Sequence, residues 1–244
     1  MDRFKELPSR MKWSHIQRFY EMLQPYLKAS PIKLSRPFAG RVLVLSPHID
    51  DDLIGCGGTL SKHVEAGNPV MALYFADCTQ DRIKEARAAA TIVGFDQLEF
   101  LNYKSKTLLD HREIGERLSA TISSYKPDMV YLPSLFDRHA DHIAVNHYLS
   151  ESCRKYRYKF TVNAYEVWNT LVPNVIVDIS SCIDKKKDAI TCYKSQLDSN
   201  DWVDGAISLN RYRGISSGVG KYAEAFMSYS SKEYCRIWER IYAS

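Results

Sequence analysis

The chain lacks the marks of a disulfide-stabilised protein, a secreted precursor or a membrane-spanning protein. Its six cysteines are scattered through 244 residues without a CxxC pair, which indicates reduced thiols rather than a disulfide framework or a zinc finger. No stretch approaches the roughly 18 apolar residues that a membrane-spanning helix needs. The first residues lack the apolar segment of a secretory signal, so we expect a cytoplasmic protein.

The chain has little net charge outside its first segment. The formal net charge is +4, but residues 1–41 hold nine Lys and Arg against three Asp and Glu. That segment therefore carries +6, and the remaining chain carries −2. A nucleic-acid partner requires basic side chains around its binding site. Because the excess of positive charge lies in the first segment, away from the predicted crevice, we expect no nucleic-acid partner.

The first segment also has apolar residues at helical spacing. They are Trp13, Ile16, Phe19, Tyr20, Leu23 and Leu27. This pattern predicts a helix that packs on the sheet or its edge. A second interpretation is a basic amphipathic surface that makes peripheral membrane contact through residues 1–36. We expect residues 1–40 to form a basic N-terminal extension and residues 41–244 to form a single domain.

Short apolar runs alternate with helical patterns along the rest of the chain. We expect strands at 41–46, 69–76, 97–101, 129–133, 160–168 and 174–180. We expect helices at 56–67, 81–94, 111–125, after His142, and at 183–197 and 231–242, with a loop from Asp198 to the last of them. The alternation predicts an α/β fold, a Rossmann-like doubly wound and mainly parallel sheet with helices on both faces.

Three consecutive aspartates follow a histidine at the end of the first predicted strand. His48 precedes Asp50, Asp51 and Asp52, and the glycine fingerprint of a dinucleotide site is absent from this turn. Helix capping explains one or two of the aspartates. A metal site is the other interpretation, because His48 and Asp51 can converge on one cation while Asp50 faces the adjacent side. Such nitrogen and oxygen ligands suit zinc.

A second polar segment, Asp137-Arg-His-Ala-Asp-His142, follows the fourth predicted strand. One of its two histidines could bind a metal while the other faces substrate and is oriented by a carboxylate. Taken by itself, the segment is explained equally well as a solvated loop. The first and fourth strands flank the switch point in a common doubly wound order, so both segments should meet in one crevice. Their coincidence favours the metal site.

With DRIKEARAAATIVG (81–94) between them, the segments PHIDDD and DRHADH resemble the PIG-L/LmbE-like family of zinc-dependent N-acetylglucosaminide deacetylases. That family includes deacetylases of the mycothiol and bacillithiol pathways. The resemblance spans roughly residues 41–226, with weaker similarity at 178–196 and 221–226. It implies a deacetylase-like catalytic domain over residues 41–244. By motif position, it implies a metal triad of His48, Asp51 and His142, a general base Asp50, a catalytic His139, and Asp141 orienting that histidine.

Two residues depart from the family pattern. Ile49 stands where proline is usual, and Asp52 stands where glutamate is common. Neither is a metal ligand or base in that pattern, so we expect zinc binding to survive. The shape of the loop stays open.

The resemblance implies metal-assisted hydrolysis of an amide, with acetate as one product. The substrate would be an N-acetylated sugar or glycoconjugate: a polysaccharide or lipid-linked precursor, a thiol glycoside, or an aminoglycoside-type intermediate. Zn²⁺ is the expected cofactor, and Fe²⁺ can occupy similar sites. Residues proposed to contact the sugar are Arg138, Asn210, Arg213, Tyr222 and Glu224.

Two other functions use similar residues. A metal-dependent phosphoesterase also has loops of carboxylates and histidines, and would need more cationic groups around its site. A non-catalytic sugar-binding protein could use the same scaffold, but the presence of both Asp50 and His139 disfavours it. Neither the sugar nor the oligomeric state follows from the sequence.

Overall fold

A computed structural model describes residues 18, 21–22, 30–95, 97–197 and 201–242. Two compact units divide the chain, residues 1–31 and residues 32–244. The sheet belongs to the second unit. Most of the predicted N-terminal helix, and with it the segment proposed to contact a membrane, lies outside the described residues. The boundary between an extension of 1–40 and a domain of 41–244 therefore stays a prediction.

An eight-stranded sheet forms the centre of the second unit, in the order β1-β7-β8-β6-β5-β2-β3-β4. Its strands are β1 (Ile32–Leu34), β2 (Val42–Ser46), β3 (Val70–Ala76), β4 (Gln97–Tyr103), β5 (Met129–Pro133), β6 (Thr161–Tyr165), β7 (Val175–Asp178) and β8 (Ala223–Ser230). All neighbouring pairs are parallel except the two that β8 makes with β6 and β7. The predicted α/β, mainly parallel fold is confirmed.

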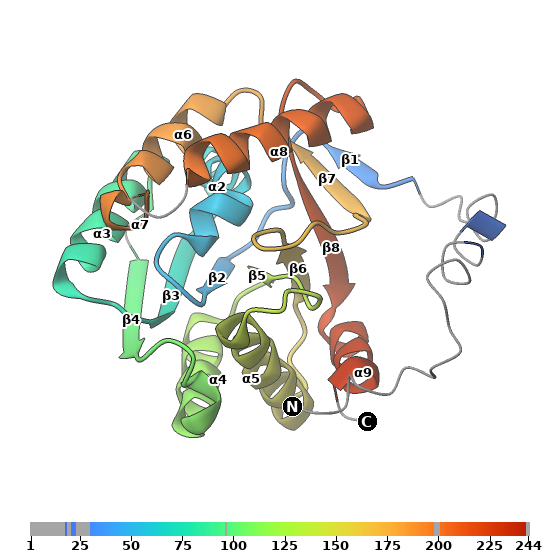
Figure 1. Ribbon diagram of the computed structural model, residues 1–244. Helices are drawn as coiled ribbons and strands as arrows, with labels where there is room; N and C mark the ends of the chain where they lie inside the picture. The colour runs from blue at the N-terminus through green and yellow to red at the C-terminus, as the bar shows by residue number, and fades with distance from the viewer. Residues whose placement is uncertain (1–17, 19–20, 23–29, 96, 198–200, 243–244) are drawn as a thin grey trace. The chain divides into compact units, whose positions relative to one another are not determined.

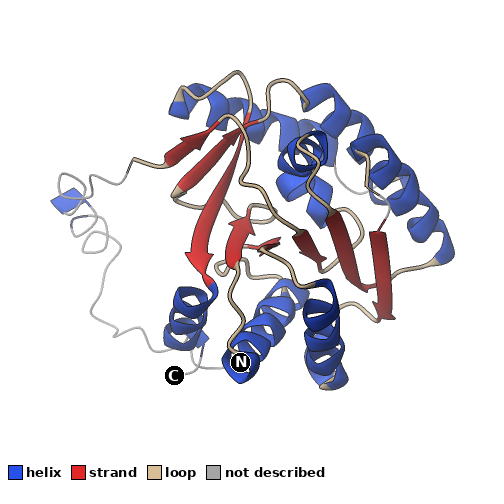
Figure 2. Ribbon diagram, turned by 180° about the vertical axis from the view of Figure 1, so that it is seen from behind, coloured by secondary structure: helices blue, strands red, loops and turns tan. Residues whose placement is uncertain are grey.

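Helices cover both faces of this sheet (Figures 1 and 2). One face carries α2 (Asp51–Glu65), α3 (Gln80–Val93), α6 (Ile183–Thr191), α7 (Lys194–Leu197) and α8 (Trp202–Ser217). The other face carries α4 (Glu113–Tyr125), α5 (Ala140–Tyr156) and α9 (Ser231–Tyr242), with the short 3-10 helix η2 (Leu108–Asp110) before α4.

The central strand β2 shows how the two faces are built. Val42 and Val44 belong to the core beneath α2 and α3, whereas Leu43 and Leu45 belong to the core beneath α4 and α5. All four side chains are fully buried. Successive strand residues point to opposite faces, so a continuous apolar run is what a strand covered on both sides requires.

Two predicted elements were wrong. The segment after Asp198, expected to be a loop, contains α8 and β8. α8 buries only Ala206, Asn210 and Gly214, so it has no apolar stripe to reveal it. α2 also begins at Asp51 rather than at 56, because the helix starts in the polar segment itself.

α2 is kinked at Cys56, and a buried ion pair forms hydrogen bonds with the backbone groups at the kink. The backbone of Cys56 leaves the helical region, with φ −141° and ψ 16°. The carbonyl of Ile54 accepts a hydrogen bond from Nζ of Lys186 at 2.8 Å, and Oε1 of Glu224 accepts one from the N–H of Gly58 at 2.8 Å. Lys186 and Glu224 are 2.7 Å apart and fully buried. The two charged groups therefore satisfy the backbone groups that a regular helix would pair with each other.

Candidate active site

The two polar segments meet at one edge of the sheet. The turn holding His48 follows β2, and the loop holding Asp137 follows β5. β2 and β5 are parallel neighbours, with Val42 beside Met129. Because their carboxyl ends lie at the same edge, the first turn of α2 and the first turn of α5 face each other there. The predicted convergence is present.

Asp51 lies between two histidines. Its Oδ2 atom is 3.1 Å from Nδ1 of His48 and 3.1 Å from Nε2 of His142. Asp51 and His142 are buried, whereas the side chain of His48 is 18% exposed. Burial disfavours the ionised form of Asp51, but the two histidines outweigh it and hold its pKa well below the usual range.

In both His48 and His142, the outer ring nitrogen, which is the one that does not face Asp51, contacts a further carboxylate. Nε2 of His48 is 2.9 Å from Oδ2 of Asp141, and Nδ1 of His142 is 2.9 Å from Oδ2 of Asp137. Burial opposes protonation of both rings. The carboxylates outweigh it, and they raise the pKa of His48 to about 10 and that of His142 to about 9. A carboxylate behind each imidazole is the usual arrangement around histidine ligands of a metal.

The donor set fits a metal ion. Nε2 of His142 is completely buried and lies 3.1 Å from Oδ2 of Asp51, but it has no hydrogen-bond partner among the described residues. A buried, unpaired nitrogen is costly unless another group binds it. One donor atom from each of His48, His139 and His142 lies within 4.8 Å of the others. Two imidazoles and a carboxylate, with a third imidazole nearby, are a donor set suited to zinc.

His139 differs from the other two histidines. It caps α5, because its Nδ1 accepts the backbone N–H of Asp141 at 3.2 Å. A neutral ring with Nδ1 as acceptor carries its proton on Nε2. Burial, with the charges of His48 and His142, lowers the pKa of His139. The ring of His139 meets that of His48 edge-on at 4.7 Å.

Asp141 lies differently from what its proposed role suggests. Its Oδ2 is 3.9 Å from Nδ1 of His139 but 2.9 Å from Nε2 of His48. The same carboxylate accepts the Ser105 hydroxyl at 2.7 Å and the Lys106 backbone N–H at 2.8 Å. The backbone of Asp141, rather than its carboxylate, makes the hydrogen bond to His139. The loop after β4 is thus a third contributor to the site.

Asp50 has a strained backbone and a carboxylate turned to the pocket. Its φ is +149°, outside the regions that residues with a side chain ordinarily adopt. Strain of this kind is concentrated at functional sites. The residue is 7% exposed, and its carboxylate accepts no hydrogen bond from the described part of the chain. Burial, reinforced by the charge of Asp51, raises its pKa well above the usual range.

Asp52 is held away from the pocket. It is fully buried, and its Oδ2 accepts the hydroxyl of Tyr74 at 2.7 Å. Its backbone N–H donates to Oγ of Ser46 at 3.0 Å. Burial raises the pKa of Asp52 to about 7. The shorter side chain at this position therefore has an internal partner on the neighbouring strand β3.

A small cavity of about 110 Å³ lies over these groups. His48, Asp50, Asp51 and His139 line one part of it, and Ile54, Trp168, Gln196 and Trp202 line the rest. We call it the reaction pocket. The two tryptophans and Gln196 come from three different elements, so no sequence motif joins them to the histidines.

None of the five residues proposed as sugar contacts lines this pocket. Glu224 is ion-paired with Lys186 and accepts the backbone N–H groups of Gly58 and Thr59. Arg213 is ion-paired with Glu166. Because both charges have buried or half-buried partners, we do not include Glu224 or Arg213 in a substrate site.

The other three proposed contacts have separate surroundings. Asn210 is buried and donates to the carbonyl of Ala223 at 3.1 Å. Tyr222 is half-buried and lies beneath the guanidinium of Arg211. Arg138 is exposed on the loop between Asp137 and His139. Of the five proposed contacts, only Arg138 is adjacent in sequence to residues of the site.

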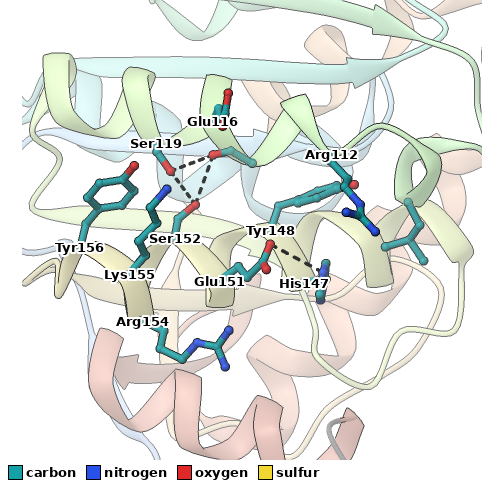
Figure 3. Close-up of a pocket in the computed structure, with 12 residues that line it drawn as sticks. Arg112, Glu116, Ser119, His147, Tyr148, Glu151, Ser152, Arg154, Lys155 and Tyr156 are labelled. Carbon is teal, nitrogen blue, oxygen red and sulfur yellow. Dashed lines mark hydrogen bonds and ion pairs between the residues drawn. The ribbon is translucent and has the colours of Figure 1, made fainter.

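A larger hollow of about 660 Å³ lies between α4 and α5 (Figure 3). Within it the hydroxyls of Ser119 and Ser152 are hydrogen-bonded at 2.9 Å, and Glu151 is ion-paired with His147. The hollow uses the carboxyl-terminal half of α5, whereas the candidate active site uses its first turn. None of the residues of the reaction pocket lines it.

Comparison with known proteins identifies relatives of the chain. The family model described as GlcNAc-PI de-N-acetylase (PIG-L) matches residues 43–153, which include both polar segments. The diacetylchitobiose deacetylase of Thermococcus kodakarensis is 23% identical over 224 residues, covering 79% of this chain and 84% of that protein.

Solved structures show the same fold. The N,N'-diacetylchitobiose deacetylase of Pyrococcus horikoshii matches with a TM-score of 0.71 at 24% identity, covering 92% of this chain and 95% of that one. The conserved protein TT1542 of Thermus thermophilus matches with a TM-score of 0.69 at 27% identity, covering 76% and 93%. Among the described residues, no helix is long and apolar enough to cross a membrane.

Proposed function

Since this chain belongs to the PIG-L family of deacetylases, we propose that it removes the N-acetyl group from an N-acetylated amino sugar or its conjugate and releases acetate. The observation that carries the proposal is the arrangement around Asp51. Its Oδ2 lies 3.1 Å from the inner nitrogens of His48 and His142, and the outer nitrogens of both rings are held by carboxylates.

His48, Asp51 and His142 are the residues we propose to hold Zn²⁺. When bound, the ion supplies a Lewis acid that lowers the pKa of water and polarises the acetamide carbonyl. Asp141 and Asp137 fix the ring orientations of His48 and His142, so the nitrogens that face Asp51 are presented without reorganisation.

Asp50 and His139 are the residues we propose to carry the proton transfers. The Asp50 carboxylate lines the reaction pocket and would accept the proton of the attacking water. Nε2–H of His139 would donate a hydrogen bond to the acetamide oxygen, where negative charge develops as water attacks the carbon. Its Nδ1 is committed to the backbone of Asp141, which supports that tautomer.

The lining of the pocket favours a neutral substrate over a phosphate ester. Two aspartates and two histidines face it, and its lining among the described residues includes no Lys or Arg. A phosphoryl group needs cationic side chains in addition to the metal, because its charge is spread over several oxygens. We therefore propose N,N'-diacetylchitobiose, the compound in the names of two relatives, and N-acetylglucosamine glycosides as the first compounds to assay.

Substitution of the proposed base tests the mechanism. Asp50→Asn should retain zinc but lose about a hundredfold to ten-thousandfold in kcat, since the amide cannot accept the proton. Acetate release is measured with protein reconstituted with zinc, and the bound metal is determined by elemental analysis. An Asp50→Asn protein that keeps its activity would overturn the assignment.

A variant of a proposed ligand is the matched control. His142→Ala should lose zinc itself, because it removes a buried ring nitrogen that has no hydrogen-bond partner in the described part of the chain. The two variants should therefore differ in metal content while both lose activity. Release of phosphate but not acetate from a mixed panel of esters and acetamides would instead support a phosphoesterase.

A further inference from the structure

Two tryptophans line the reaction pocket together with its polar groups. Trp168 lies on the segment between β6 and β7, and Trp202 begins α8. Their rings meet edge-on with centroids 4.8 Å apart, and the ring of Trp168 is nearly parallel to that of His139 at 6.4 Å. Trp168 is 54% exposed although it adjoins a buried site.

The backbone around Trp168 is fixed by the proposed metal site. Its N–H donates to Oδ2 of Asp137 at 3.3 Å, and that same oxygen is 2.9 Å from Nδ1 of His142. The position of Trp168 is therefore coupled to the carboxylate that orients a candidate zinc ligand.

A second set of contacts fixes the segment on either side of Trp168. Oε1 of Glu166 accepts the N–H of Leu171 at 2.8 Å. Arg213 is ion-paired with Glu166 and donates from Nη2 to the carbonyl of Leu171 at 2.8 Å. Arg213, on α8, thus closes the segment from 166 to 171 as a clamp. Trp168 is presented from a backbone held at three points.

An exposed aromatic ring held in place beside a reaction site is suited to binding a ligand. Its face is apolar, and covering it on binding costs little side-chain entropy because the backbone is already ordered. A pyranose ring has an apolar face of C–H groups and a polar rim of hydroxyls. In the reaction pocket the acetamide would face His48, Asp50, Asp51 and His139, which leaves the ring for the tryptophans.

We infer that Trp168, supported edge-on by Trp202, is the platform on which the hexosamine ring stacks, and that it selects cyclic N-acetyl amino sugars over acyclic acetamides. This inference rests on the proposed function for the identity of the ligand. It makes Trp168 a specificity-determining residue and Arg213 a positioning residue that acts through the clamp.

The test compares the cyclic and the open-chain form of an N-acetyl amino sugar as substrates. Acetate release is measured from methyl N-acetyl-β-glucosaminide and from N-acetylglucosaminitol, which carries the same acetamide on an open chain. The zinc-loaded full chain should prefer the ring. In Trp168→Ala the ratio of the two kcat/KM values should fall about tenfold or more, mainly through KM for the ring, and Trp168→Phe should recover part of it.

A neighbour in the same segment provides the control. Val172 is 74% exposed and does not line the pocket, so Val172→Ala should leave the ratio unchanged. Arg213→Lys should lower the ratio without lowering the zinc content. A Trp168→Ala protein in which both substrates lose kcat/KM equally, or in which the ratio stays the same, would overturn the inference.

A binding measurement separates this inference from the proposed function. In the Asp50→Asn background, the glycoside should quench tryptophan fluorescence, and the addition of Trp168→Ala should weaken its affinity at least tenfold. If sugars release acetate but neither the affinity for the glycoside nor the ratio of kcat/KM values depends on Trp168, the stacking role of Trp168 is wrong and the proposed function is supported. If no sugar releases acetate but the glycoside binds through Trp168, the function fails and the platform stands.

Discussion

The Oδ2 atom of Asp137 accepts a hydrogen bond from the ring of His142 and another from the backbone of Trp168. Asp137 itself is 1% exposed, and its hydrogen bond with His142 outweighs the effect of burial and lowers its pKa. It is therefore a carboxylate at all physiological pH values, placed to keep one tautomer of His142.

Removal of this carboxylate should weaken zinc binding. In Asp137→Ala the His142 ring loses the group that fixes its orientation, so we expect zinc affinity to fall about tenfold to a hundredfold. Competition with a chromophoric chelator measures it without any assay of activity. Asp184→Asn, on the exposed start of α6, is the control. Equal affinities in the two variants would contradict the role of Asp137.

His63 is buried far from these groups, and it should make stability depend on pH. The amide of Asn68 donates to its Nδ1 at 2.9 Å, so Nε2 carries the proton and donates to the hydroxyl of Tyr131 at 2.9 Å. Burial lowers the pKa of His63 to about 4, below the ordinary value of about 6.5. The unfolded chain therefore binds a proton between these values that the folded chain does not.

The contribution of neutral His63 to the free energy of unfolding is fully present above pH 6.5 and is lost as the pH falls towards 4. The loss at pH 4.5 is on the order of 2–3 kcal/mol. Urea unfolding at pH 7.5 and 4.5 should show a smaller pH dependence in His63→Gln than in the natural chain. His147→Gln, at a partly exposed position, should keep the full dependence. If the free energy of unfolding depends on pH identically in all three proteins, His63 is not the source of that dependence.

At the scale of elements, the break in α2 rests on two charged side chains from other elements. Removing one partner leaves an unpaired buried charge, so Glu224→Gln or Lys186→Met should each lower the free energy of unfolding by about 3–5 kcal/mol. The double variant should lose less than the sum of the two. Chemical denaturation measures all three, and additive losses would contradict the coupling.

The adjacent lysine offers a matched comparison. Lys185 makes an ion pair with Glu65 at 3.0 Å, but both side chains are exposed. Such pairs contribute about 0–1 kcal/mol. Lys185→Met should therefore change the stability far less than Lys186→Met.

Elements differ in how well their sequences predict them. β2 and β5 are predictable because strands buried on both faces are continuous apolar runs, and their order in the sheet brings His48 and His142 together. β8 was missed because its segment, AEAFMSYS, places a buried Glu224 among small residues. That glutamate resembled a substrate contact, since its partner Lys186 lies 38 residues away.

At the candidate active site, too, the residues that could not be predicted are those brought together from distant parts of the sequence. The histidines and aspartates lie in two short segments of distinctive composition, so their chemistry could be inferred before their geometry. Trp168, Trp202 and Ser105 are single residues on separate loops or helix ends, and only the folded chain brings them to the site. Asp137 lay within a motif, but nothing in the spacing distinguished an orienting carboxylate from one that pairs with Arg138.

At the scale of the whole molecule, the proposed metal should raise thermal stability. Zinc bound to the folded chain stabilises it by about 2.7 kcal/mol when free zinc is 100 times Kd. For a chain of this size, that corresponds to a rise in Tm of roughly 5–10 °C over the metal-free protein. Calorimetry with and without a chelator measures it. Asp50→Asn should keep the shift and His142→Ala should lose it, and a natural chain without any shift would contradict zinc binding at this site.

β8 lies between β6 and β7 although it follows both in the chain. On the ribosome, β2 to β6 emerge before β7 and β8, so the part of the sheet that carries both histidine segments can assemble while synthesis continues. β7 and β1 cannot join it until residues 223–230 have emerged, since β8 is the strand that connects them to β6. Until then the nascent chain carries an open strand edge, the kind of surface on which incomplete chains aggregate. Slow translation of residues 166–230 would prolong that exposure.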